Sequence, residues 1–241
     1  MVDIHSHILP MVDDGANSWE VAVEMVKMAE RDGVTHMVAT PHANFEYTYS
    51  RESHQALLAE LQAKVGNGIQ LILGCDFHFS FDNVEDAANN PTRYAIGNTR
   101  YMLIELSDYS IPQQVPTMLF RLTSKGMIPI LTHPERNAIL QKSPERVRDW
   151  VDIGLLVQIT AGAFVGKWGR GVQKLANWYV EHGMAHVLAS DAHSTNHRNP
   201  ILSEARKIVG KEYGKEFATA MLETVPMAIV NNQPLPEIPE I

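Results

Sequence analysis

The chain has 241 residues, of which 45% are apolar and 20% are charged. This composition is that of an ordinary globular protein and excludes a disordered, collagen-like or coiled-coil chain. The net charge of -8 argues against non-specific binding to nucleic acid or to an anionic membrane surface. Cys75 is the only cysteine, which excludes an intrachain disulfide framework and a Cys-rich zinc site.

The chain shows no signal for membrane insertion or export. No apolar stretch approaches the roughly 18 residues of a membrane span, and no basic-then-apolar leader opens the sequence. We therefore expect a cytoplasmic protein. The 11 histidines are many for this length, and several stand beside carboxylates.

Short apolar runs alternate with helical patterns along the chain. The runs predict seven strands, at residues 2–4, 36–39, 69–74, 101–106, 127–131, 155–159 and 186–189. The patterns between them predict helices at 18–32, with Ser18 as N-cap, and at 51–65, 113–125, 144–152 and 172–182. Two or three more helices are expected after Asn199.

This alternation predicts an α/β protein with a parallel sheet. Seven strand–helix units without a Gly-rich dinucleotide turn favour a closed barrel over an open, doubly wound sheet. No linker divides the chain, so we expect one domain at residues 1–233. A Pro-rich, acidic tail at 234–241 is expected to fray or to pack locally.

Six of the seven predicted strands end in His, Asp or Glu. In a parallel barrel these ends open on one rim, where the active sites of eight-stranded barrels lie. We expect nine side chains to converge there: His5, His7, Asp14, His42, Asp76, Glu105, His133, Asp191 and His193.

Metal binding explains these nine residues better than separate structural roles do. A lone histidine is usually a hydrogen-bonded structural residue, and Asp14 could simply cap the turn at Gly15. Several carboxylates at one mouth would repel one another, however, unless protons or cations neutralise them. Nine nitrogen and oxygen ligands are too many for one ion, but they could serve two or three. Without thiolates, the set suits manganese, iron, zinc or magnesium.

Four motifs resemble the polymerase and histidinol phosphatase (PHP) family. They are Asp3-Ile4-His5-Ser6-His7, Thr40-Pro41-His42, His133-Pro134-Glu135-Arg136 and Ser190-Asp191-Ala192-His193. Residues 3–10, 12–15 and 101–106 are similar, more narrowly, to the bacterial manganese-dependent protein-tyrosine phosphatases of capsule and exopolysaccharide synthesis.

The resemblance implies a distorted (β/α)7 barrel in which the nine residues hold three divalent metal ions, manganese first among the candidates. It also implies that Arg136 and Arg198 contact the substrate phosphate, and that a bacterial tyrosine autokinase supplies the phosphotyrosine. One departure concerns Asp76, because the subgroup usually carries the longer Glu at that place.

The residues themselves support phosphoester hydrolysis. Clustered divalent ions generate hydroxide from water and screen the phosphoryl oxygens, and an arginine offers a planar donor fork to a phosphate dianion. A tyrosine leaving group, with a pKa near 10, departs with little help from a general acid. Cys75 is not a phosphatase nucleophile, because Phe81 stands six positions on where Arg is required. Residues 162–167 do not complete a phosphate-binding loop, because Trp168 replaces the Ser or Thr.

Aromatic residues complete the expected rim. The segment 45–49 is predicted to form a mobile lid over an aromatic substrate, with packing onto the scaffold as the alternative. Comparable rim positions are expected for Phe77, Phe79, Phe164 and Trp168. Two other functions stay open: a small-molecule phosphatase, for example one acting on histidinol phosphate, and a non-catalytic metal-binding scaffold.

Overall fold

The strands are all parallel and belong to two sheets. The computed structural model describes residues 1–79 and 81–241. The smaller sheet has the order β1 (Val2–Ser6), β2 (His36–Ala39), β4 (Gln70–Leu73). The larger has the order β3 (His42–Ala43), β5 (Asp76–His78), β6 (Tyr101–Glu105), β7 (Ile128–Thr132), β8 (Leu156–Thr160), β9 (Val187–Ala189).

The two sheets join into one barrel of seven strand lines. The strands β3 and β5 continue the lines of β2 and β4 after short breaks, one of which contains Pro41, a residue without a backbone N–H to donate. On the opposite side, Asp191 N donates to His5 O at 2.9 Å and His7 N donates to Ala192 O at 2.8 Å. These bonds connect β1 to the end of β9, so the predicted (β/α)7 architecture is confirmed. The breaks that separate β3 and β5 were not predicted.

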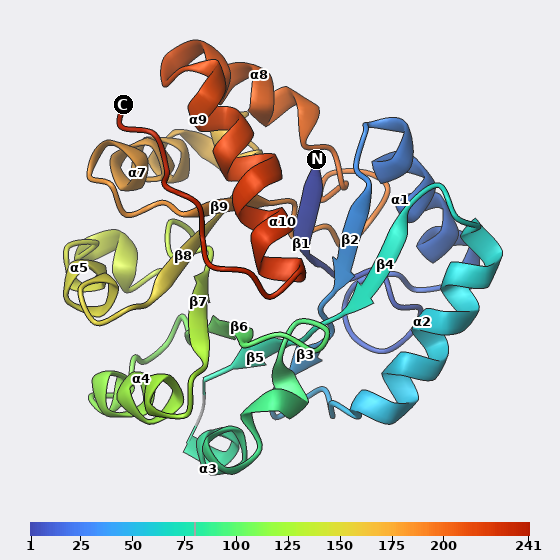
Figure 1. Cartoon of the computed structure of the whole chain (residues 1–241), viewed down its shortest axis with the longest axis horizontal. Coiled ribbons are helices and arrows are strands. Elements are labelled where there is room, and N and C mark those ends of the chain that lie inside the picture. Colours follow the sequence, from blue (N-terminus) through green and yellow to red (C-terminus); the bar gives the residue numbers. More distant parts are fainter. Residues whose placement is uncertain (80) are drawn as a thin grey trace.

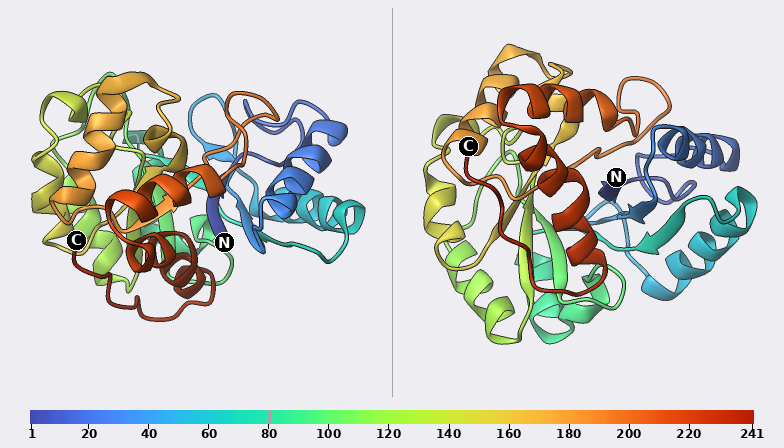
Figure 2. Two further views of the ribbon diagram at one scale, coloured as in Figure 1. Left: turned by 90° about the horizontal axis from the view of Figure 1, so that it is seen from above. Right: turned by 45° about the horizontal axis from the view of Figure 1, so that its top comes forward.

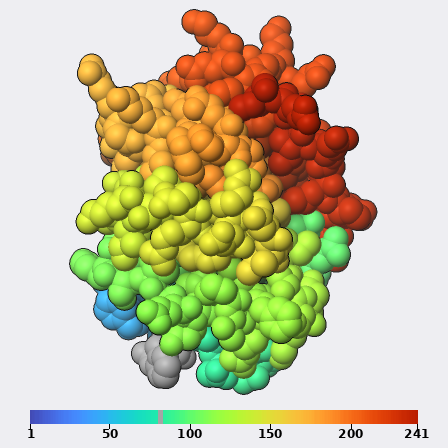
Figure 3. Space-filling view, turned by 90° about the vertical axis from the view of Figure 1, so that its left-hand side faces the viewer, coloured from blue at the N-terminus to red at the C-terminus, as the bar shows by residue number. Residues whose placement is uncertain are grey.

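Helices cover the outside of the barrel (Figures 1 and 2). In α1, Ser18 caps the helix as predicted, and one face of the helix is buried. The face in Figure 3 shows mainly the green, yellow and orange parts of the chain, which include α4, α5 and α7, with the red C-terminal part at the upper right. The helices up to this point are α1 (Trp19–Arg31), α2 (Arg51–Val65), α3 (Phe81–Asn89), α4 (Val115–Ser124), α5 (Arg146–Val151), α6 (Ala161–Phe164) and α7 (Gly169–Glu181). Of these, α3 and α6 were not predicted.

The last part of the chain closes the amino-terminal end of the barrel. It forms α8 (Ser203–Glu212), α9 (Lys215–Thr219), η3 (Ala220–Thr224) and α10 (Val225–Val230). Val225 and Ile229 of α10 pack into the cluster that fills the barrel, together with Val2 and Ile4 of β1. This end is therefore plugged, which leaves the opposite rim as the open one.

The tail at 234–241 contains neither helix nor strand, yet part of it packs on the barrel. Leu235 and Ile238 contact the core, and Tyr101 Oη donates to Gln233 O at 2.7 Å just before the tail. Of the two expected behaviours, local packing is the observed one. Within residues 1–79 and 81–241, no helix has both the length and the apolarity that crossing a bilayer requires.

The barrel contains a histidine that stabilises it only while neutral. Val157 N donates to His186 Nδ1 at 3.1 Å, and burial lowers the pKa of His186 to about 4. Below pH 6.5 the unfolded chain binds a proton that the folded chain still excludes, so the free energy of unfolding falls as the pH drops toward 4. We expect this loss, measured by urea unfolding at pH 7 and pH 5, to be smaller in His186→Gln. An equal loss in both proteins would contradict the assignment.

Candidate metal centre

All nine predicted ligands meet at the carboxyl-terminal rim. Each one has a ligand atom within 3.6 Å of a ligand atom of another member. They come from the ends of β1, β6, β7 and β9 and from the first residues of β3 and β5, with Asp14 on the loop after β1. Parallel strands bring residues far apart in sequence to one rim, as expected.

Seven of the nine predicted ligands form three overlapping groups, each able to hold an ion, and His133 and Asp191 belong to none of these groups. The first contains His7, Asp14, His42 and His193; the second contains His5, His7 and Asp76; the third contains His42, Asp76 and Glu105. His7, His42 and Asp76 each belong to two groups. Adjacent cation sites would therefore share ligands, and a carboxylate such as Asp76 has two oxygens with which to bridge them.

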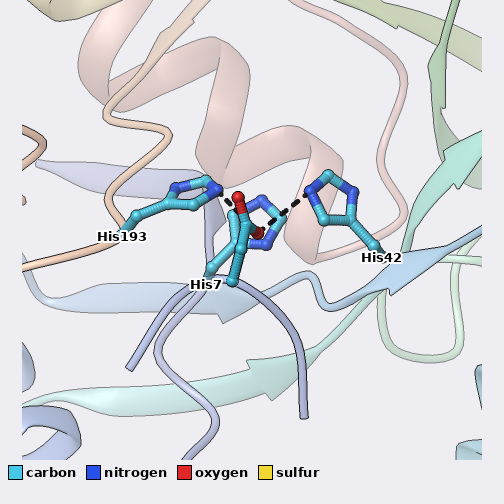
Figure 4. A group of neighbouring side chains, drawn as sticks. His7, His42 and His193 are labelled. Carbon is cyan, nitrogen blue, oxygen red and sulfur yellow. Dashed lines mark ion pairs between the residues drawn. The ribbon is translucent and has the colours of Figure 1, made fainter. Parts of the chain in front are cut away.

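The first group lies at the mouth of the centre. The imidazoles of His7, His42 and His193 face a common point (Figure 4). There, Asp14 Oδ1 lies 3.4 Å from His42 Nε2 and 3.3 Å from His193 Nε2. The Asp14 side chain is 47% exposed, so this group is the one that solvent and substrate reach most directly.

Hydrogen bonds orient three of the histidines. The Nδ1 atoms of His5, His7 and His193 donate to Gln158 Oε1 at 2.9 Å, Asp13 Oδ2 at 2.7 Å and Asp191 O at 3.1 Å. A proton held on Nδ1 leaves the Nε2 lone pair free for a metal ion. These three histidines therefore present Nε2 to the centre.

The buried polar atoms test whether cations fit. Within the described part of the chain, both oxygens of Asp76, Oδ1 of Asp191 and Nδ1 of His42 are buried without a hydrogen-bond partner. Asp76 Oδ2 lies only 3.4 Å from His5 Nε2 and from His42 Nδ1. Burying such atoms unsatisfied is costly, and a divalent cation bound by nitrogen and oxygen would satisfy them together. The residues fit divalent metal ions.

The pKa values show how strongly the carboxylates attract positive charge. Burial lowers the pKa of a histidine, and it holds that of His7 at about 3 with help from the neighbouring His193. For His5, Asp76 and Asp191 overcome burial and raise the pKa to about 9. Asp14 and Asp76 likewise raise the pKa of His42 to about 11. The field that stabilises these protons also favours bound cations, which would compete with them.

Two of the predicted ligands have unusual backbone conformations. His133 has φ 35° and Asp191 has φ 51°, in the left-handed region that non-glycine residues seldom adopt. Each follows a strand and is held by a hydrogen bond to the neighbouring one: His133 N donates to Gln158 O, and Asp191 N donates to His5 O, both at 2.9 Å. The barrel thus supports strain that turns both side chains toward the centre.

Asp13 lies in the segment 12–15 beside the predicted ligand Asp14, but no role in the site was predicted for it. Its Oδ2 accepts from His7 Nδ1 at 2.7 Å and from His42 N at 3.2 Å, and its Oδ1 accepts from Gly15 N at 3.0 Å. A Cβ on Gly15 would lie 2.1 Å from His7 O, so only glycine permits this turn. The motif therefore has three functions: Asp13 orients two histidines, Asp14 faces the centre, and Gly15 lets the loop pack on β1.

His78 and Gln158 also escaped prediction. His78 Nδ1 lies 3.5 Å from Glu105 Oε2, and His78 pairs in register with Glu105. Its spacing of two from Asp76 is the same signal that places His5 and His7 on one side of a strand, so it could have been found. Gln158 carries no comparable signal, because an amide inside a predicted apolar strand does not indicate chemistry by itself.

Both predicted phosphate ligands lie beside the centre and bind the same oxygen. Arg136 Nη1 donates to Asp191 Oδ2, and Arg198 Nη2 donates to it at 2.7 Å. Asp191 Oδ1 instead faces the histidines, 3.5 Å from both His5 Nε2 and His7 Nε2. One carboxylate therefore joins the two arginines to the candidate metal ligands.

A cavity of about 340 Å³ adjoins the candidate metal ligands and Arg136. Glu105, His133 and Arg136 line it at the centre, and Trp168 forms part of its wall. Asn137, one of the polar residues in the cavity wall, donates hydrogen bonds to Leu106 O at 3.0 Å and to Ser107 O at 3.1 Å. These bonds tie the loop after β6 to the loop after β7, so the cavity is preformed.

The aromatic residues divide between rim and scaffold. Tyr47 stacks beside His42 with 6.0 Å between ring centroids, so it lies near the mouth of the centre. Phe45 is 93% exposed and extends into solvent. Tyr49 is buried and donates to Gly74 O at 3.1 Å, which makes it part of the scaffold. The rim prediction is wrong for three phenylalanines whose side chains fill the core between barrel and helices: Phe77, Phe79 and Phe164.

Cys75 is fully buried, and burial raises the pKa of its thiol well above the usual value. A thiol without access to solvent and without thiolate character is not a nucleophile. This environment agrees with the exclusion of cysteine-based phosphatase chemistry.

Comparison with known proteins identifies the family. Residues 1–231 match the family described as "Capsular polysaccharide synthesis, CpsB/CapC". The chain belongs to this family. It is 31% identical to the tyrosine-protein phosphatase YwqE of Bacillus subtilis, over 96% of this chain and 92% of that protein. It is 30% identical to the tyrosine-protein phosphatase CpsB of Streptococcus pneumoniae, over 97% of this chain and 99% of that protein.

A solved structure extends the similarity to three dimensions. A crystal structure from a study of YwqE and CpsB, described there as metal-dependent tyrosine phosphatases, superimposes with a TM-score of 0.91. The match has 30% identity and covers 98% of this chain and 96% of that one. For this CpsB/CapC family member, the fold and the family resemblance predicted from sequence are therefore confirmed.

The contacts of Asp13 lead to a prediction about metal retention. We expect Asp13→Ala to weaken manganese binding by about 10- to 100-fold, because His7 loses the partner that fixes its ring. Metal content after dialysis against a graded chelator measures the effect. Asp149→Ala, on the exposed face of α5, is the matched control and should retain metal as the native protein does. Equal retention in both variants would show that Asp13 does not orient the ligand.

Proposed function

We propose that this protein hydrolyses phosphotyrosine in proteins at a centre of three divalent metal ions. The observation that carries the proposal is that nine nitrogen and oxygen ligand side chains meet at one rim, and that Arg136 and Arg198 both bind Asp191, which is one of the nine. The similarity to tyrosine-protein phosphatases over nearly the whole chain supports the same reaction. The activity, metals and site roles below are parts of this proposal.

The nine donors would hold the ions, with the shared residues between adjacent sites. Manganese is our first choice, and iron, zinc and magnesium suit the same oxygen and nitrogen donors. When bound, such ions supply the nucleophile by activating water and offset the charge of the phosphoryl oxygens. The protein's own contribution is to hold the donors rigidly, through Asp13, Gln158 and the strained turns at His133 and Asp191.

Arg136 and Arg198 would bind the phosphoryl group. Both guanidinium groups converge on Asp191 Oδ2, at the edge of the centre, and both remain partly exposed, at 19% and 27%. A planar guanidinium has further N–H groups to offer beyond the one given to Asp191, and these suit a phosphate dianion. The arginines would thus orient the ester and stabilise the charge that develops during its hydrolysis.

The tyrosine side chain fits beside this group. The cavity next to Arg136 lies against the centre and offers room for the ring and the adjoining peptide. A phenolate leaves readily because the pKa of tyrosine is about 10, so the site needs no dedicated general acid. The phosphoprotein that we propose is a tyrosine autokinase of capsular or exopolysaccharide synthesis, met in the cytoplasm.

Substrate and metal selectivity test this function. We expect metal-stripped protein to be inactive, and added manganese to restore hydrolysis of a phosphotyrosine peptide far more than of phosphoserine or histidinol phosphate. Arg136→Ala should lower kcat/KM about 30- to 1,000-fold through loss of a charged contact. Arg170→Ala, on the exposed first turn of α7, is the control. Activity confined to histidinol phosphate would overturn the proposal, and silence on all three substrates would favour a scaffold role.

Substitutions of Tyr47 and Tyr49 distinguish a residue that contacts the substrate from one that packs in the scaffold. Tyr47→Ala should raise KM for a phosphotyrosine peptide about 3- to 10-fold and leave the melting temperature unchanged, because Tyr47 lies beside His42 without being buried. Tyr49→Ala should instead lower stability by about 3–5 kcal/mol, since its ring is buried. An unchanged KM in Tyr47→Ala would remove this segment from substrate binding.

A further inference from the structure

The loop before α7 places Trp168 against one of the two site arginines. The guanidinium carbon of Arg136 lies 4.7 Å from the centroid of the Trp168 ring. The ring of His197 meets the same indole edge-on, with centroids 6.2 Å apart, and His197 directly precedes Arg198. One aromatic side chain therefore contacts Arg136 and the loop that carries Arg198.

The backbone around Trp168 is adapted to hold the indole in place. A Cβ on Gly162 would lie 2.6 Å from Trp168 Cζ3 and 3.2 Å from its Cη2, so the ring packs directly on a glycine of α6. Lys167 Nζ donates to Asn199 Oδ1 at 2.7 Å. This bond fastens the Trp168 loop to the Arg198 loop. The glycine-containing segment that fails as a phosphate-binding loop thus has a different function, which is to seat a tryptophan.

We propose that Trp168 is a positioning residue that holds the Arg136 guanidinium, and through His197 the Arg198 loop, in the orientation that receives the substrate phosphate. The inference rests on the proposed role of the two arginines. A single bond from Arg136 to Asp191 leaves the guanidinium plane free to turn about that contact. Contact with the face of an aromatic ring restrains the guanidinium plane, and it shields that side of the guanidinium from water.

This arrangement predicts an effect on phosphate recognition rather than on metal binding. An indole does not ligate a divalent cation here, and Trp168 contacts Arg136, His197 and Gly162 and packs against the hydrophobic core. Removing the aromatic face should therefore weaken the binding of substrate and of inorganic phosphate alike. The metal content should not change.

The experiment compares Trp168→Leu and Trp168→Phe with the native protein. We expect Trp168→Leu to raise both KM for a phosphotyrosine peptide and the inhibition constant of orthophosphate about 3- to 30-fold. Trp168→Phe, which keeps an aromatic face, should recover most of this loss. Trp178→Leu is the matched control, because Trp178 is a half-buried tryptophan of α7 that stacks on His182. Metal content and melting temperature are measured for every variant.

A double-mutant cycle decides whether Trp168 acts through Arg136. In the Arg136→Ala background, adding Trp168→Leu should raise KM clearly less than it does in the native background, because Arg136 is gone and only the Arg198 loop remains for Trp168 to position. Equal losses in both backgrounds, or an unchanged orthophosphate constant in Trp168→Leu, would overturn this inference alone. An Arg136→Ala protein with native kinetics would overturn the arginine role as well.

A substitution at Gly162, on which the Trp168 ring packs, tests the position of the indole independently. Gly162→Ala places a methyl group where the indole lies, so it should displace the ring without removing it. We expect KM and the orthophosphate constant to rise as in Trp168→Leu. Should Trp168→Leu fold poorly, Gly162→Ala and Trp168→Phe carry the test. Native constants in Gly162→Ala would then contradict the proposal.

Discussion

The structure depends on the gathering of four carboxylates, two of them buried, among five imidazoles at one rim of a barrel. Asp76 and Asp191 are almost inaccessible to solvent, and carboxylates this close repel one another. Removing them from water is also costly, so the arrangement persists only where positive charge compensates it. Histidines and arginines supply part of that charge, and bound cations are proposed to supply the rest. The fold around the rim is arranged to keep these groups together.

Asp191 joins the two halves of the proposed chemistry. Its Oδ1 faces the histidines, whereas its Oδ2 accepts from both Arg136 and Arg198. The strained backbone at this residue is held by a hydrogen bond to β1, the strand that carries His5 and His7. The hydrogen bond that closes the barrel between β9 and β1 therefore also fixes the position of Asp191 in the site. A shift between β1 and β9 would move the candidate metal ligands and the two arginines together.

Residues at both ends of the barrel hold this rim in place. At the amino-terminal end, α10 plugs the barrel with Val225 and Ile229, so the strands cannot slide toward that end without losing apolar contact. At the open end, Asp13 orients two histidines, and Trp168 packs between Gly162 and Arg136. These residues do not perform chemistry themselves. They limit the freedom of the side chains to which we assign chemistry, and enzymes gain much of their rate from such preorganisation.

The sequence by itself determined the barrel and the set of residues that converge, because strand periodicity and the residues just after each strand are local properties. His5 and His7 at a spacing of two, or Asp191 after an apolar run, can be read without a partner. Tertiary structure decided what depends on register between distant segments. It separated Asp13 from Asp14, placed His78 beside Glu105, buried Phe77 and Phe79, and set Trp168 against Arg136. Such contacts join residues whose proximity no local pattern encodes.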